Sequence, residues 1–203
     1  MRLEALAVAL PEVVGHPNRV PFEGVLTLVD EPSTRPPSGA RGHRVILTRE
    51  AALAALPSLM GMAVDYAPGW DGHDARRKCG IITQADVEGN RLQVSGYLFG
   101  KDFPEVEDRM RQGAAGTMGM SYEIADAQVE DMNSEIWKLT RATFTGAAIL
   151  LREKAAYRNT SFQLAAKRCR NVAVRHAPVV ERARPLNGRS NSQLVKGKEA
   201  RWR

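Results

Sequence analysis

The chain of 203 residues has few cysteines and few histidines. Its two cysteines, Cys79 and Cys169, lie 90 residues apart, a spacing that matches no CxxC metal or redox motif. The four histidines are scattered, and no pair has the i, i+4 spacing of a helical zinc site. A metalloenzyme is therefore disfavoured, and we expect no cofactor and no metal.

The sequence also lacks an apolar run of 18 residues, so it predicts no membrane span. Near the amino terminus a lone Arg2 precedes an apolar stretch that Glu4 interrupts, which is a poor secretory signal and indicates a cytoplasmic protein. The glycine-rich fingerprints of dinucleotide and phosphate binding are absent, because the glycines at 113 and 116 follow a predicted helix instead of opening one.

Positive charge is unevenly distributed. Residues 1–151 hold 15 Lys and Arg against 20 Asp and Glu, whereas residues 152–203 hold 14 against 3. Beyond residue 157 the pattern loses periodicity, and Phe162 and Trp202 are the only aromatic residues. So little apolar surface does not offset the entropy of ordering a chain. We therefore predict a folded domain over 1–157 and a flexible basic C-terminal tail over 158–203.

The domain reads as mostly β. Runs rich in β-branched and aromatic residues predict strands at 20–30, 43–48, 62–66, 117–124 and 136–145, and a hairpin over 79–99 with its turn at 88–90. Helices are predicted at 49–56, capped by Thr48, and at 103–112, capped by Asp102. Strands that do not alternate regularly with helices predict an α+β, mostly β fold: an antiparallel sheet or small barrel with flanking helices.

Two residues far apart in the sequence could form a nucleophilic site. Ser121 follows Gly119 and Met120 at the start of a predicted strand, and His73 lies in the polar loop 67–78. An imidazole within hydrogen-bond reach of a serine hydroxyl can take its proton during attack on a carbonyl. Taken alone, each residue is more often a solvent-facing serine or an ordinary loop histidine.

The order of these elements resembles that of the capsid maturation (prohead) proteases of tailed phages, a family related in fold to the herpesvirus assemblins. The resemblance covers roughly residues 20–157 and rests on an ordered set of segments: Leu59-Met60-Gly61-Met62-Ala63-Val64, His73, Cys79-Gly80-Ile81-Ile82, Leu92-Gln93-Val94-Ser95-Gly96-Tyr97-Leu98, the helix at 103–112, Gly119-Met120-Ser121, and 139–151.

The resemblance implies that Ser121 is the nucleophile, that His73 is its general base, and that backbone amides near Gly119 and Met120 bind the oxyanion. Where the family often places an acidic residue in the closing strand, this chain has Arg141. The candidates for an acid that orients the histidine are therefore Asp65, Asp71, Asp74 and Glu123, and a Ser-His dyad is the alternative.

On this basis we expect a serine endopeptidase of phage capsid maturation, which cleaves scaffold, capsid precursor and itself inside the assembling prohead in the host cytoplasm. The resemblance also implies a homodimer, with capsid precursor and scaffold proteins as partners. Two alternatives stay open: a catalytically inactive assembly or scaffolding protein of the same fold, and a nucleic-acid-binding module that uses the basic tail.

Overall fold

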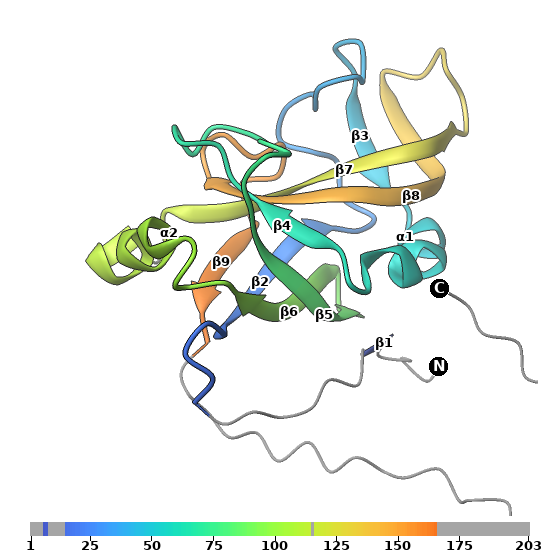
Figure 1. The fold of residues 1–203 in the computed structure, drawn as a ribbon. Coiled ribbons are helices and arrows are strands. Elements are labelled where there is room, and N and C mark those ends of the chain that lie inside the picture. Colours follow the sequence, from blue (N-terminus) through green and yellow to red (C-terminus); the bar gives the residue numbers. More distant parts are fainter. Residues whose placement is uncertain (1–5, 8–14, 115, 166–203) are drawn as a thin grey trace, which may run out of the picture. The chain divides into compact units, whose positions relative to one another are not determined.

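The computed structural model describes residues 6–7, 15–114 and 116–165 (Figure 1). Nine strands among these residues form one sheet. They are β1 (Leu6–Ala7), β2 (Val20–Leu28), β3 (Arg44–Leu47), β4 (Ala63–Asp65), β5 (Lys78–Glu88), β6 (Arg91–Leu98), β7 (Met118–Val129), β8 (Ile136–Leu151) and β9 (Ser161–Leu164).

The long strand β8 organises this sheet. It pairs antiparallel with β7 along most of its length, parallel with β3 through its first residues, and parallel with β4 at Ala147 and Ala148. From β4 the sheet continues antiparallel through β5, β6, β2 and β9. The predicted α+β, mostly β class is confirmed. The sheet is open, and it is mixed because β3 and β4 run parallel to β8.

Two α-helices lie among the described residues, α1 (Arg49–Ala55) and α2 (Pro104–Arg109). The predicted cap of α1 is confirmed, since Thr48 Oγ1 accepts a hydrogen bond from the Ala51 amide at 3.3 Å. The predicted cap of α2 is wrong: Asp102 Oδ2 accepts from Asn18 Nδ2 instead, and α2 starts with Pro104 after an uncapped Phe103. A proline at the first helical position needs no capped amide of its own.

After α1 comes a 3₁₀ turn, Leu56–Leu59, and after α2 a π turn, Met110–Ala114. No helix in the described ranges is long and apolar enough to cross a membrane.

The two faces of β7 and β8 have different surroundings. Met118 and Met120 of β7 and Ala147 and Ile149 of β8 belong to the main hydrophobic core. Ala148 and Leu150, with side chains on the opposite face, belong to a small separate cluster with Ala155. Successive side chains of a strand point to opposite faces, so β7 presents one row of side chains to the core and another to the second face.

The sheet curls so that β2 and β9 pack against the core face of β7 (Figure 1). Gly24 of β2 permits this approach, because a Cβ there would lie 2.7 Å from Met120 Sδ and 2.6 Å from the Ser161 carbonyl oxygen. Such close contacts leave room for glycine alone.

The sheet extends past residue 157, where the sequence predicts the domain to end. Strand β9 pairs with β2 from Phe22↔Leu164 to Val25↔Ser161, and Phe162 is 1% exposed. Its ring centroid lies 5.2 Å from that of Phe22. The predicted boundary is therefore too early by at least these residues, because the backbone of β9 pairs with β2 while Phe162 packs into the core. The rest of the predicted tail, residues 166–203, lies outside the described residues.

Candidate active site

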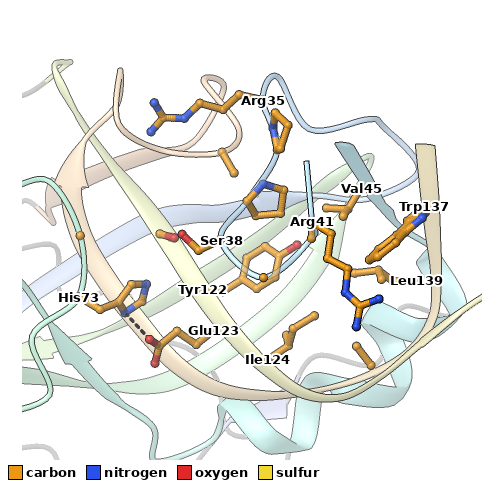
Figure 2. A pocket seen from close by; sticks show the side chains of 18 of the residues that line it. Arg35, Ser38, Arg41, Val45, His73, Tyr122, Glu123, Ile124, Trp137 and Leu139 are labelled. Carbon is orange, nitrogen blue, oxygen red and sulfur yellow. Dashed lines mark ion pairs between the residues drawn. The ribbon is translucent and has the colours of Figure 1, made fainter. Parts of the chain in front are cut away.

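A cavity of about 1010 Å³ opens on the second face of β7 and β8. Its walls come from the loop before β3, the loop that carries His73, and both strands of the β7–β8 pair. Figure 2 shows that His73 and Glu123 lie at one end of the cavity, whereas Val45, Ile124, Trp137 and Leu139 gather at the other. The cavity therefore joins an end with the titratable groups His73 and Glu123 to an end where apolar side chains surround Arg41.

His73 lies in a loop that is hydrogen-bonded to the end of β8. The Leu151 amide donates a hydrogen bond to the Trp70 carbonyl at 2.7 Å, and the Ala67 amide donates to the Gly72 carbonyl at 3.2 Å. Trp70 adopts φ 56°, which is unusual for a bulky residue, and its ring stacks on that of Tyr66 with centroids 4.9 Å apart. These contacts fix the loop over the sheet and place the imidazole, whose side chain is 19% exposed, in the cavity.

Asp65 ends strand β4 and lies beneath this histidine. Its side chain is 1% exposed, its Oδ1 lies 3.3 Å from His73 Nδ1, and its Oδ2 lies 2.7 Å from Lys78 Nζ. Burial opposes ionisation of this carboxyl, but the contacts with His73 and Lys78 outweigh burial and lower the pKa of Asp65 below its ordinary value. Asp65 is therefore a buried carboxylate between two cationic or basic groups.

Ser121 lies on β7, the strand that pairs with the other side of β8. Asp65 pairs with Ala148, and Ala148 pairs with Ser121. Side chains at paired positions point to the same face of a sheet, so both polar residues flank Ala148 on the second face. Their Cα atoms are roughly 10 Å apart, twice the spacing of neighbouring strands. Two side chains with an imidazole between them can span this distance.

The other acidic candidates lie differently. Glu123 faces His73 (Figure 2). Its Oε1 is 3.9 Å from His73 Nδ1, and its side chain is 54% exposed. Asp71 lines the cavity without an ion pair to His73. Asp74 turns to the arginines that follow it, with Oδ1 accepting from Arg76 Nε at 3.1 Å. The fold thus brings Asp65 and Glu123 to the histidine and directs Asp74 away from it.

In the segment expected to bind an oxyanion, one backbone amide already donates a hydrogen bond within the protein. The Met120 amide donates to Thr160 Oγ1 at 3.3 Å, and that hydroxyl donates to the Tyr157 carbonyl at 3.0 Å. Gly119 is buried beside the same threonine, since a Cβ there would lie 2.5 Å from Thr160 Oγ1. The Met120 amide is therefore already bound, and glycine is needed at 119 for the packing of Thr160.

Neither ring nitrogen of His73 forms a hydrogen bond within the described part of the chain, although both nitrogens are buried. At Nδ1, Asp65 Oδ1 at 3.3 Å lies off the direction of a hydrogen bond, and Glu123 Oε1 at 3.9 Å is too distant for one. The opposite nitrogen, Nε2, has no polar partner among the described residues. A buried ring nitrogen without a partner is suited to exchange a proton with a group that enters the cavity.

Several residues of this site escape sequence reasoning. Lys78 reads as one member of a solvated run with Arg76 and Arg77, yet it pairs with the buried Asp65. A signal was present, because an acid inside the short apolar run before Tyr66 requires a cationic or hydrogen-bonding partner when that strand is buried. The contribution of residues 35–41 to the cavity wall has no such signal.

No family model matches this chain, and no curated protein matches its sequence. Within the described ranges, no group of three or more His, Cys, Asp or Glu side chains is arranged to hold a metal ion. The structure defines a mostly β, α+β domain in which His73 lies beside the buried Asp65 and lines the same cavity as Ser121.

Proposed function

We propose that this protein is a serine endopeptidase in which Ser121 is the nucleophile, His73 the general base and Asp65 the acid that orients the histidine. The observation that carries the proposal is the position of His73. Its Nδ1 lies 3.3 Å from the buried Asp65, in a cavity that Ser121 also lines.

The chemistry follows from these positions. As Ser121 Oγ bonds to the carbonyl carbon of a peptide, its proton passes to His73 Nε2, and the carboxylate of Asp65 stabilises the imidazolium that forms. The C–N bond then breaks as His73 returns the proton to the leaving amine. Water repeats the sequence on the acyl ester, which releases the carboxylic acid and restores Ser121.

The substrates are proposed from the resemblance to phage prohead proteases. They are capsid precursor and scaffold proteins and the chain itself, and the resemblance adds the proposal of a homodimer within an assembling prohead. The apolar side chains of the cavity support a polypeptide substrate, because they offer a surface for an apolar side chain in the same cavity as the proposed nucleophile.

A catalytically inactive assembly protein of the same fold is the second candidate. Two observations favour it: no hydrogen bond joins Ser121 to His73 in the described structure, and the Met120 amide is bound to Thr160. The third candidate, a nucleic-acid-binding module, depends on a basic tail most of which lies outside the described residues.

Intact mass over time separates the first two candidates. Full-length wild type, Ser121→Ala and His73→Ala are incubated alone and with the capsid and scaffold proteins encoded beside the gene. We expect only the wild type to cleave, and a fluorophosphonate probe to label the wild type but not Ser121→Ala. Ser134→Ala and His16→Ala are matched controls outside the cavity and should behave as wild type. Intact proteins and an unlabelled wild type would exclude the peptidase in favour of the assembly protein.

A further inference from the structure

A second carboxylate approaches His73 from the strand that carries the proposed nucleophile. Glu123 follows Ser121 by two positions on β7, so both side chains lie on the same face of the sheet. Glu123 Oε1 is 3.9 Å from His73 Nδ1, the same nitrogen that faces Asp65. Two acidic groups from different strands therefore converge on one imidazole nitrogen.

The balance of charges around His73 indicates what the Glu123 carboxylate contributes. Lys78 Nζ lies 2.7 Å from Asp65 Oδ2, so the negative charge of Asp65 is already matched by one positive charge. An imidazolium that forms at His73 adds a second positive charge to this pair. The carboxylate of Glu123 supplies the remaining negative charge, which stabilises the charged histidine at the moment of proton transfer.

The path of the Glu123 side chain depends on a glycine in β8. Glu123 pairs with Gly146, and a Cβ built on Gly146 would lie 2.5 Å from Glu123 Oε2, 3.3 Å from its Cδ and 3.4 Å from its Cβ. All three of the nearest heavy atoms thus belong to the glutamate. The glutamate lies across β8 in the space that a side chain at position 146 would fill.

We propose that Glu123 is a positioning residue for His73 and that Gly146 is the residue that admits it. The inference rests on the proposed function, in which His73 acts as the base for Ser121. Asp65 and Glu123 then have different roles at the histidine. Asp65 is the buried, fixed partner of the ring, whereas Glu123 reaches the ring over a strand that lacks a side chain at the crossing.

Gly146→Ala tests this placement without altering a polar group of the site. The added methyl displaces the end of the flexible Glu123 side chain and meets no other atom as closely. We compare the full-length wild type with Glu123→Gln, Glu123→Ala, Gly146→Ala and the double variant Glu123→Ala/Gly146→Ala. Glu130→Gln removes a carboxylate just after the end of β7, outside the cavity, and is the matched control.

Two measurements are made on each variant. The first is the rate at which a fluorophosphonate probe labels Ser121. We expect each single variant except the control to label about three- to fivefold more slowly, the size of one half-exposed ion pair. The double variant should be no slower than Glu123→Ala, because the methyl acts only by moving a glutamate that is then absent.

The second measurement does not depend on catalysis. Two-dimensional ¹⁵N NMR of the histidine rings reports which nitrogen of His73 carries the proton. Carboxylates at Nδ1 favour the Nδ1–H tautomer. Glu123→Gln and Gly146→Ala should both shift the population toward Nε2–H, and Glu130→Gln should leave it unchanged. Thermal melting of each variant excludes unfolding as the cause.

The outcomes distinguish this inference from the proposed function. If the wild type does not label but the tautomer shifts as expected, the peptidase proposal fails and the placement of Glu123 stands. If the wild type labels and Gly146→Ala changes neither the labelling rate nor the tautomer, the inference is overturned while the peptidase proposal survives. A double variant that labels much more slowly than Glu123→Ala would also overturn it, because the glycine would then act on something else.

Discussion

Replacement of Asp65 by asparagine separates an orienting acid from a merely structural one. The substitution keeps the size of a side chain that is 1% exposed and removes the charge that lies 2.7 Å from Lys78 Nζ and 3.3 Å from His73 Nδ1. Breaking a buried ion pair costs about 3–5 kcal/mol. Lys78 is 39% exposed and regains part of its hydration, so we expect a loss of about 1–3 kcal/mol in the free energy of unfolding.

The same substitution should change how stability depends on pH. The pKa of Asp65 is lower in the folded protein than its ordinary value of 3.8. The unfolded chain therefore binds a proton at this residue more readily, so the contribution is fully present above about pH 4 and is lost as pH falls through the folded pKa. Urea unfolding at several values between pH 7 and pH 3 should show less acid destabilisation in Asp65→Asn than in the wild type.

On activity, an amide beside Nδ1 can favour the wrong tautomer of the histidine. An orienting carboxylate in a serine peptidase is worth up to about 10⁴-fold, and Glu123 should offset part of this loss, so we expect a decrease of about 10²–10³-fold. The assay is the labelling rate of Ser121 in wild type and variant. A variant that loses stability but keeps its labelling rate would refute the orienting role and leave Asp65 as the structural partner of Lys78.

Asp86→Asn is the matched control for this experiment. Asp86 lies on β5 and does not line the cavity. Burial, with the nearby Glu88 carboxylate, raises the pKa of this residue, which is the opposite direction to Asp65. Because Asp86 lies outside the cavity, Asp86→Asn should leave activity unchanged. Because burial disfavours the charged carboxylate, loss of the charge should slightly increase stability at pH 7.

Three further predictions concern stability and reactivity. Phe162→Ala removes a 1% exposed ring from the core and should cost about 3–4 kcal/mol in urea unfolding; a near-neutral result would show that the domain ends before β9. Thr48→Ala removes the cap of α1 and should cost about 1 kcal/mol by the same assay, with Thr48→Ser close to wild type. Burial raises the pKa of Cys79 to about 12, so in a Cys169→Ser background a thiol reagent at pH 8 should react only after unfolding; rapid reaction in the folded protein would contradict this.

The strands and the first helix could be predicted because their signals are local. Thr48 precedes a run of good helix formers, and the β-branched run at 20–30 and the hairpin over 79–99 carry their own turn residues. The ends of β7 and β8 were harder to predict. Their last residues are held by pairing with each other across the β7–β8 register, which no short window of sequence reports.

The residues of the candidate site were likewise predictable from the sequence only in part. Ser121 and His73 could be named from residue type and order, because a nucleophile and a base have few side chains to choose from. The choice among four acids could not be made, since it depends on which strands lie on either side of β8. Parallel pairing of β4 with β8 places Asp65 opposite Ser121 across Ala148, and the antiparallel register of β7 places Glu123 over Gly146.

The sequence by itself therefore determined the mostly β class, the local caps and turns, and two members of a candidate site. Tertiary structure alone decided the partner of His73, the burial of Asp65 against Lys78, and the addition of β9 through Phe162. The physical reason is that propensity and capping act between neighbours in the chain. Ion pairs, register and close backbone approach join residues that only the folded sheet brings together.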